Sequence, residues 1–387
     1  MPSLKVTAVI GAGFGDEGKG LVVDYLAAKN PDAIVVRFNG GAQAGHTVVR
    51  PERRHAFSHV GSGTFAGAAT YLAHTFLVNP LLWRKEQNAL DMLGNVPRPA
   101  LIVDPSAVFT TPYDMLVNQE LERARGEARH GSCGYGINET VTRSTILPGH
   151  ICKAASPIWL RDFLRVTSDY SMGRMNVFSY QPSIEFVSRM VSSGIRDDFE
   201  KAMGEFLAAS TFADRLPKGR DVIFEGAQGL LLDEEHEFFP HVTRSRTGLT
   251  NVITLARRNG ISELEVIYVT RAYMTRHGAG PFPTEDLTLS YPDETNAQNE
   301  FQGTLRFGHL DVKLIGQAIA RDLRRAKEVG LCVAPSLAVT CLDQVGDVSH
   351  YLRVCSALIE ETGLPIRLWS YGPSRENVRV YAPPLET

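Results

Sequence analysis

The first forty residues place a strand, a glycine-rich loop, a helix and a second strand in direct succession. Residues 4–10 form an apolar run, residues 11–15 read Gly-Ala-Gly-Phe-Gly, and residues 17–29 show the apolar spacing of a helix. Asn-Pro at 30–31 ends this helix, and residues 33–38 form a second buried strand. Strands joined through a helix pair in parallel. The order therefore predicts an α/β fold with a mostly parallel central sheet and flanking helices.

Later parts of the chain extend this pattern. Further buried strands are predicted at residues 100–103, 222–224, 265–269 and 337–340. Each is followed by a polar or glycine-containing loop, and ligands bind beyond the carboxyl ends of such strands, so we expect the loops to converge on one site. Residues 116–215 are mostly helical in pattern, which predicts a helical insertion within one catalytic domain spanning residues 1–387. Residues 378–387 resemble a tail.

Charge and composition exclude several classes of protein. Lys and Arg number 40 against 43 Asp and Glu, whereas a dedicated nucleic-acid binder would be strongly basic. The apolar runs are interrupted before the roughly 18 residues that a membrane span needs, and residues 1–6 lack a signal-peptide layout. The five cysteines form no CxxC pair, which favours reduced thiols over a zinc site. We expect a cytoplasmic protein without a nucleic-acid or membrane partner.

The first loop has the spacing of a phosphate-binding loop. Residues 13–19 match GxxxxGK, in which backbone N–H groups at a helix start bind phosphate and Lys19 adds charge. Such loops place Ser or Thr after the lysine to hold magnesium, but this chain has Gly20. Asp16 lies inside the loop, where its carboxylate could hold Mg²⁺ or take a proton. The alternative is a tight glycine turn with a solvated Asp-Glu pair.

Glycine-rich loops follow three more predicted strands. Residues 39–47 end in Gly45 and His46, and a histidine in such a loop is a candidate acid or phosphate ligand, although isolated histidines are more often structural. The other two loops are residues 225–229 and 275–281. Four glycine-rich loops that each follow a strand are hard to explain by turn formation alone. We therefore expect these loops to form an active site.

These loops resemble the signatures of the adenylosuccinate synthetase family. The matching segments are residues 15–20 (GDEGKG), 40–47, 224–233, 275–285 (TRHGAGPFPTE), 340–343 and 370–373. The resemblance covers nearly the whole chain and implies the P-loop-like fold of that family. It also implies the reaction: a nucleoside triphosphate phosphorylates the 6-oxygen of a purine nucleoside monophosphate, and the amine of L-aspartate then displaces phosphate.

The resemblance also implies roles for individual residues. Asp16 would remove the proton from purine N1 and touch Mg²⁺, which the backbone of Gly45 also holds. His46 would act as an acid on the moving phosphoryl group, Lys19 would stabilise its charge, and Gln228 would hold the acceptor and count among the catalytic residues. The nucleotide- and phosphate-binding set is Gly13, Phe14, Gly15, Glu17, Gly18, Gly20, Gly45, Thr47, Ser132, Cys133, Arg143, Gln228, Thr243, Asp343, Gly372 and Pro373.

Two further expectations come from the resemblance. Arg143 matches an arginine that reaches the nucleotide phosphate of a partner subunit, which implies a homodimer. The family's arginine-rich aspartate loop is shorter here and has one arginine. We expect its residues to bind aspartate, with the arginine as a bidentate fork on a carboxylate: Gly303, Thr304, Leu305 and Arg306.

The short aspartate loop and residues 57–63 resemble a phage branch of the family. That branch acts on dGMP and makes N6-succino-2-amino-2'-deoxyadenylate on the way to 2-aminoadenine DNA. Its members often carry Ser where Asp16 stands, so Asp16 fits either an early-branching member or an enzyme that uses IMP. We expect dGMP with ATP, in a host cytoplasm if the protein is phage-encoded, and keep IMP with GTP as the alternative. A nucleotide-binding regulator is the non-enzyme alternative, but a mere binder need not retain a base and an acid.

Overall fold

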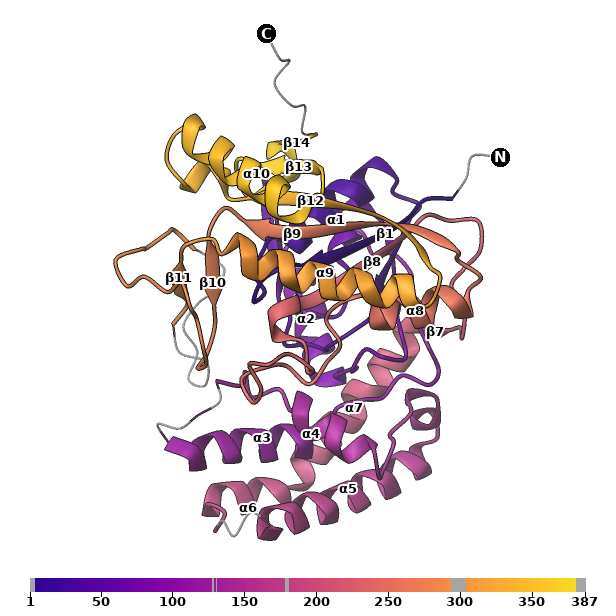
Figure 1. The fold of residues 1–387 in the computed structure, drawn as a ribbon. Coiled ribbons are helices and arrows are strands. Elements are labelled where there is room, and N and C mark those ends of the chain that lie inside the picture. The colour runs from indigo at the N-terminus through magenta and orange to yellow at the C-terminus, as the bar shows by residue number, and fades with distance from the viewer. Residues whose placement is uncertain (1–3, 127–128, 130, 178–180, 294–303, 381–387) are drawn as a thin grey trace.

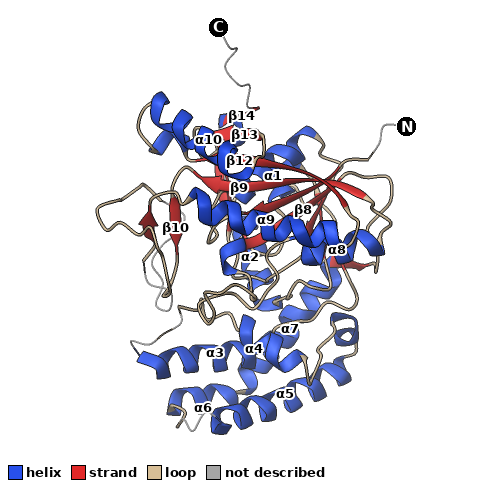
Figure 2. Cartoon of the chain, in the orientation of Figure 1, coloured by secondary structure: helices blue, strands red, loops and turns tan. Residues whose placement is uncertain are grey.

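A ten-stranded sheet forms the centre of the computed structural model, which describes residues 4–126, 129, 131–177, 181–293 and 304–380 (Figures 1 and 2). In spatial order its strands are β14 (Val378–Val380), β13 (Ile366–Ser370), β12 (Cys332–Thr340), β9 (Glu263–Arg271), β1 (Val6–Gly11), β8 (Val222–Gly229), β2 (Ile34–Arg37), β5 (Ala69–Leu72), β6 (Leu101–Val103) and β7 (Ser210–Phe212). Neighbouring strands pair in parallel except β14, which pairs antiparallel with β13. The predicted α/β class with a mostly parallel sheet is therefore confirmed.

Helices cover both faces of this sheet. The longer helices are α1 (Lys19–Lys29), α2 (Pro80–Met92), α3 (Pro112–Arg125), α4 (Ile137–Ser144), α5 (Pro157–Val177), α6 (Ile184–Met190), α7 (Ser193–Ala209), α8 (Leu249–Arg258), α9 (Val312–Glu328) and α10 (Val348–Thr362). Short 3-10 turns are η1 (Ser62–Ala66), η3 (Ile151–Ala155), η4 (Leu230–Leu232), η5 (Leu342–Gln344) and η6 (Arg375–Asn377). Two hairpins lie outside the main sheet, β3 (His46–Arg50) with β4 (Arg53–Phe57) and β10 (Met274–Arg276) with β11 (Arg306–Gly308). None of the helices in these described ranges is long and apolar enough to cross a membrane.

Alternating side chains explain why the central strands are apolar throughout. In β1, Ala8 and Ile10 pack into the cluster that α8, α9 and α10 cover, whereas Val9 packs on the other face with α1. In β8, Phe224 packs on the same face as Ala8 and Ile10, and Ile223 packs on the same face as Val9. A strand buried on both faces needs an unbroken apolar run, which is the pattern that parallel sheets produce.

The helical layer has its own core. Helices α3 to α7 lie together beyond the sheet, at the bottom of Figure 1. With α2 they pack around a separate apolar cluster that includes Trp83, Phe109, Phe163 and Phe206. Strands β5 and β6 contribute to this cluster, so the layer is joined to the sheet through apolar contact.

Three local expectations were wrong. Residues 225–229, expected as a loop, continue β8, because Glu225 pairs with β1 on one side and with β2 on the other. Residues 378–380, expected in a tail, form the edge strand β14. Helix α1 begins at Lys19 rather than at residue 17, since Asp16 and Gly18 have φ angles of 60° and 90° that a helix cannot contain.

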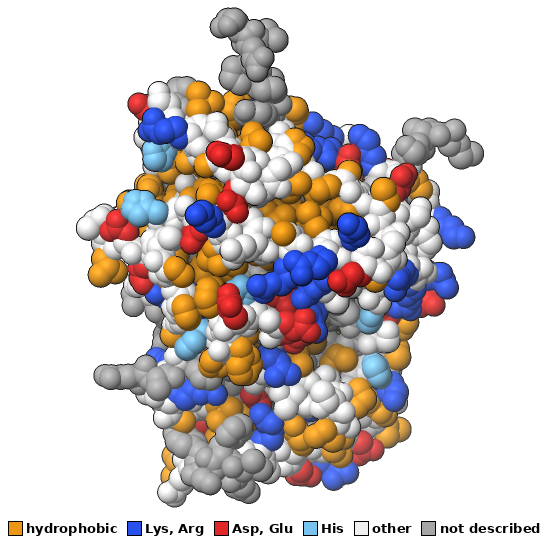
Figure 3. Space-filling view, viewed as in Figure 1, with side chains coloured by type: hydrophobic (Ala, Val, Ile, Leu, Met, Phe, Trp, Pro, Cys, Tyr) orange, Lys and Arg blue, Asp and Glu red, His pale blue; other side chains and the backbone are white. Residues whose placement is uncertain are grey.

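Opposite charges are interspersed on the face that Figure 3 shows. Among the charged side chains of the protein, Arg246 contacts Glu234 and Glu235, and Arg325 donates to Glu235. These arginines are therefore partly neutralised by carboxylates. Arg246 lies three residues after Thr243, and its pairing with two carboxylates favours a solvated loop over a phosphate-binding role.

Candidate active site

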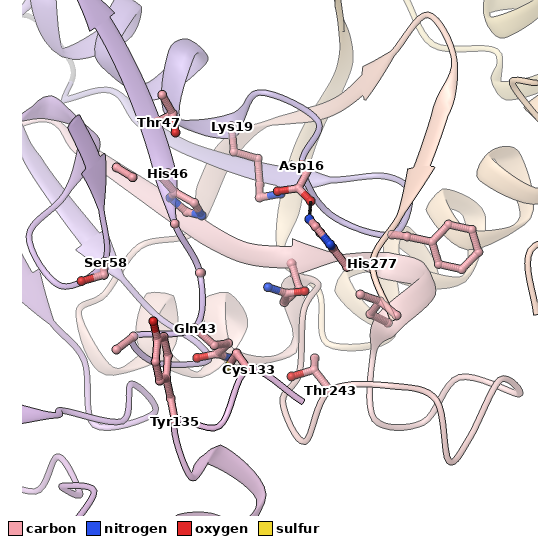
Figure 4. Close-up of a pocket in the computed structure, with 18 of the residues that line it drawn as sticks. Asp16, Lys19, Gln43, His46, Thr47, Ser58, Cys133, Tyr135, Thr243 and His277 are labelled. Carbon is pink, nitrogen blue, oxygen red and sulfur yellow. Dashed lines mark ion pairs between the residues drawn. The ribbon is translucent and has the colours of Figure 1, made fainter. Parts of the chain in front are cut away.

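A cavity of about 1110 Å³ opens where the carboxyl ends of β1, β2, β8, β9 and β12 meet the helical layer (Figure 4). Ligand sites commonly occupy about 300–1,000 Å³, so this volume suits more than one small ligand. The predicted residues that line it are Phe14, Asp16, Gly18, Lys19, Gly20, Gly45, His46, Thr47, Ser132, Cys133, Gln228, Thr243, Asp343, Gly372 and Pro373. The structure thus brings together segments that lie more than 300 residues apart in the chain.

Glu17 shapes the first loop from behind and does not line this cavity. One of its oxygens accepts the N–H groups of Gly13 (3.0 Å) and Gly15 (2.8 Å), and the other pairs with Lys19 at 2.6 Å. The carboxylate and the ammonium are both buried. Glu17 therefore organises the loop, and the nucleotide contacts expected of Glu17, Gly13 and Gly15 stay a prediction. A Cβ on Gly229 would lie 2.1 Å from the Gly13 carbonyl oxygen, so β8 can approach this loop only with glycine there.

Asp16 is held at the tip of the loop in a left-handed backbone conformation. Its carbonyl oxygen accepts a hydrogen bond from Nε of Arg271. Its Oδ2 lies 3.4 Å from Nε2 of His277, and Figure 4 shows the two side chains directed toward one another. Aspartate tolerates a positive φ better than most residues, so the loop can present this carboxylate to the cavity without a large strain.

His46 begins β3 and pairs with a carboxylate from the sheet. Its Nδ1 lies 2.7 Å from Oε1 of the fully buried Glu225, which also accepts the N–H and hydroxyl of Ser62. Burial by itself would raise the pKa of Glu225, but His46, Arg37 and Ser62 lower it to about 2. Burial lowers the pKa of His46.

This pairing sets the tautomer of the imidazole. Because Glu225 accepts from Nδ1, the second nitrogen of His46, Nε2, carries the lone pair when the ring is neutral. Nε2 is buried and has no hydrogen-bond partner within the described ranges. His46 lines the cavity, so this nitrogen can receive a ligand.

Two residues of the site were missed by sequence reasoning. Glu225 was seen only as the start of a loop, although a carboxylate that directly extends a buried apolar strand needs a partner. His277 was seen only as part of a motif. Neither partner can be found by spacing, because His46 and Asp16 lie far away in the chain.

Arg143 is directed into its own subunit. Its side chain is fully buried, its Nε donates to Asp114 at 2.9 Å, and its remaining nitrogens donate to Asp114 and to the carbonyls of Phe109 and Leu147. A guanidinium paired in this way stabilises the junction of α3 and α4. The expected contact with a partner's nucleotide stays a prediction, which these contacts within the subunit do not support.

The aspartate-binding role of residues 303–306 stays a prediction, and the structure describes part of this loop. Gly303 lies outside the described residues, and neither Thr304, Leu305 nor Arg306 lines the cavity. Arg306 pairs with Glu285 (Nε–Oε1 2.7 Å) and donates to the carbonyls of Gly278 (3.1 Å) and Gly280 (3.0 Å). Its donors are thus already used, and it holds the loop that follows β10.

The cavity offers hard oxygen ligands for a divalent cation. Asp16 and Gly45 both line the cavity, and a carboxylate and a backbone carbonyl are oxygen donors. Mg²⁺ prefers oxygen and is commonly held by one or two protein groups together with substrate phosphates. The donor set therefore fits Mg²⁺, with no more than these two residues of the chain needed.

Comparison with known proteins agrees with this site. The profile of the family described as adenylosuccinate synthetase matches residues 8–357. An adenylosuccinate synthetase of Chlorobium chlorochromatii is 31% identical over 370 residues, covering 93% of this chain and 81% of the relative. That of Stenotrophomonas maltophilia is 33% identical over 361 residues, covering 90% and 79%.

Solved structures show the same fold at lower identity. A fully ligated adenylosuccinate synthetase from Plasmodium falciparum superimposes with a TM-score of 0.75 at 17% identity, covering 98% of this chain and 100% of that one. A succinoaminodeoxyadenylate synthetase of cyanophage S-2L, bound to dGMP and dATP, gives a TM-score of 0.66 at 15% identity, covering 97% and 95%.

Sequence and fold together define a carbon–nitrogen ligase with a phosphate-binding loop. The chain belongs to the adenylosuccinate synthetase family, and the reaction of this class joins aspartate to a purine nucleotide.

Proposed function

We propose that this enzyme transfers the γ-phosphoryl group of a nucleoside triphosphate to O6 of a purine nucleoside monophosphate and then joins the amine of L-aspartate to C6, releasing phosphate. The observation that carries this proposal is the convergence of Asp16, Lys19, His46 and Gln228 on one cavity. A regulator that only binds nucleotides would need the glycine loops but not a carboxylate and an imidazole at the same cavity.

The residues divide the first step between them. A neutral lactam oxygen is a poor nucleophile, so Asp16 takes the N1 proton as O6 attacks the γ-phosphorus. Lys19 and His46 stabilise the charge on the phosphoryl group, because phosphoryl transfer depends mainly on positioning and electrostatics. Glu225 keeps His46 in the tautomer that presents Nε2, and the dianionic phosphoryl group favours a proton there. Mg²⁺, held by Asp16 and the Gly45 carbonyl, would neutralise phosphate charge when bound.

Further residues orient the acceptor. Gln228 adopts a φ of 62°, a backbone conformation that non-glycine residues rarely adopt away from functional sites. It lines the cavity beside the first loop, where a Cβ on Gly15 would lie 3.5 Å from its Oε1, and Thr243 lines the cavity from the segment after η4. We assign both to the acceptor nucleotide, and Asp343 with Gly372 and Pro373 to the base of the donor.

The proposed acceptor is dGMP. Support comes from the short aspartate loop and from residues 57–63, which resemble the phage branch, and from the shared fold with the dGMP-bound cyanophage enzyme. A guanine adds a 2-amino donor next to N1, and leaving it buried without an acceptor costs about 1–3 kcal/mol. The carboxylate of Asp16 can accept from N1–H and from the 2-amino group, so this residue is compatible with dGMP.

IMP with GTP is the second candidate. It is favoured by sequence, because relatives at 31–33% identity are adenylosuccinate synthetases. Asp343 could accept from the N1–H and 2-amino group of a guanine donor, whereas a proposed ATP donor lacks both groups.

A substrate matrix separates these candidates. The purified enzyme is assayed with dGMP, GMP, IMP and dIMP against ATP, dATP and GTP, with L-aspartate and Mg²⁺, by phosphate release and by mass of the succino product. We expect the highest kcat/KM with dGMP and ATP. Turnover of IMP without any succino product from dGMP would refute dGMP as the acceptor. If no combination of acceptor and donor releases phosphate, the proposed ligase activity is refuted.

Arg306 is proposed to support aspartate binding by holding residues 277–281. Its replacement by Ala should raise the KM for aspartate about tenfold, more than the KM of either nucleotide, since loss of a charge-assisted hydrogen bond costs roughly 1.5–3 kcal/mol. Glu285→Gln is the matched control and should act in the same direction, because it breaks the same link. If Arg306 instead binds aspartate itself, Glu285→Gln will leave the KM for aspartate unchanged, and an unchanged KM in Arg306→Ala would contradict any role of Arg306 in aspartate binding.

We also propose a homodimer located in the cytoplasm, that of a host if the gene is phage-borne, with no nucleic-acid partner. The dimer follows from family resemblance alone, because the buried Arg143 no longer supports it. Analytical ultracentrifugation of the active enzyme measures this state directly.

A further inference from the structure

We infer that His277 is a positioning residue that orients the carboxylate of Asp16 for proton removal from the acceptor purine. This inference rests on the proposed role of Asp16 as the base and adds a residue from a second loop that positions its carboxylate. His277 directly follows β10, so the inference links the first phosphate-binding loop to the loop at residues 277–281. The sequence motif at residues 275–285 contains His277 but assigns it no function.

The geometry places one imidazole nitrogen against one carboxylate oxygen. Nε2 of His277 lies 3.4 Å from Oδ2 of Asp16, and the two side chains are 21% and 28% exposed at the cavity wall. Figure 4 shows that they approach each other across the cavity from different loops. A donor on Oδ2 fixes the plane of the carboxylate and leaves Oδ1 to face a ligand.

The backbone on both sides of this contact is held in place. Arg276 is buried, and its guanidinium donates to the carbonyls of Pro281 (2.7 Å), His241 (2.8 Å) and Ala279 (3.3 Å). On the opposite side, Arg271 donates to the Asp16 carbonyl. Because neither loop can drift freely, the contact between His277 and Asp16 is in place before substrate binds.

This preorganisation matters for a carboxylate on a tight turn. Without a partner, the Asp16 carboxylate can rotate about its Cβ–Cγ bond and spend much of its time in planes that do not meet N1–H. A displacement of about 1 Å in a catalytic group can lower a rate about 100-fold. The contact with Nε2 of His277 is expected to limit this rotation.

A different role for His277 would be to bind a carboxylate of the incoming aspartate. Both roles use a ring nitrogen at the same wall of the cavity, so activity alone does not separate them. They differ in the step affected: positioning of Asp16 acts on phosphoryl transfer to O6, whereas aspartate binding acts afterwards.

Three variants test the contact atom by atom. The amide nitrogen of Gln can replace Nε2, that of Asn replaces the position of Nδ1, and Val removes both donors. Because Nε2 faces Asp16, His277→Gln should keep kcat within about threefold, whereas His277→Val and His277→Asn should lower kcat about 10- to 100-fold, with the KM for aspartate changed less than about twofold. Thermal unfolding of each variant, and nucleotide affinity, should match the wild type.

Positional isotope exchange isolates the first step. ATP labelled with ¹⁸O in the β,γ-bridge is incubated with acceptor nucleotide and without aspartate. Reversible transfer of the γ-phosphoryl group to O6 lets the β-phosphate rotate and moves label out of the bridge. We expect slow exchange in His277→Val and near-normal exchange in His277→Gln.

Unchanged exchange in His277→Val, with a raised KM for aspartate, would overturn the inference and assign His277 to aspartate. Wild-type kcat in His277→Val would overturn it as well. Failure of the proposed function looks different, since the wild-type enzyme itself would then give neither exchange nor succino product.

Discussion

Asp16→Asn is expected to abolish turnover while leaving nucleotide binding largely intact. General-base catalysis contributes about 10²- to 10⁴-fold, so kcat should fall by about three orders of magnitude. Asn has the same shape and adopts positive φ angles readily, so the loop around Asp16 (φ 60°) should keep its backbone. Steady-state kinetics and calorimetric titration with each nucleotide measure the two effects.

Magnesium separates the two functions of this carboxylate. If Asp16 serves mainly as a Mg²⁺ ligand, a higher Mg²⁺ concentration should restore much of the activity of Asp16→Asn. If it serves mainly as the base at N1, added Mg²⁺ should restore little. Near-normal kcat in this variant would remove Asp16 from the mechanism altogether.

Glu225→Gln is expected to cause the second large loss. Glu225 accepts from His46 and twice from Ser62, and an amide in its place presents one N–H₂ group toward a donor. The imidazole must then change tautomer or lose its partner, and the loss of a carboxylate that orients a histidine has cost about 10⁴-fold in kcat in a serine protease. We expect kcat to fall about 10²- to 10⁴-fold.

The same substitution should reduce stability, because it removes one member of a buried charged cluster. The pKa of Glu225 is lowered to about 2 from an ordinary 4.5, so its charge stabilises the fold above pH 4.5, and this contribution is lost as the pH falls toward 2. Denaturant unfolding of the wild type should therefore show a loss of stability in this window that Glu225→Gln lacks. Glu235→Gln is the matched control, since Glu235 is 53% exposed and should leave kcat near normal. Equal effects of the two substitutions would contradict the role assigned to Glu225.

Local sequence determined the fold class and the core of the site. Apolar runs separated by helical periodicity are sufficient to specify a parallel sheet, because a strand buried on both faces and a helix buried on one face leave different patterns. Asp16 and Lys19 were identified because the phosphate-binding loop is contiguous, and His46 because it ends a second glycine-rich segment. Each of these signals lies within a few residues of chain.

Tertiary structure decided the partners. Sheet order places β8 between β1 and β2, which sets Glu225 against His46 although 179 residues separate them. It also buries Arg143 against Asp114, whereas the family resemblance had implied a contact between Arg143 and a partner's nucleotide.

The hairpin of β10 and β11 acts in the same way on the aspartate loop, where it joins Arg306 to Glu285. A short motif states which side chains are present, but hydrogen bonds and ion pairs between distant segments depend on strand order and register. For this reason the sequence could predict which reactive side chains line the cavity. Only the folded chain showed which charged side chains face the cavity and which are paired with one another.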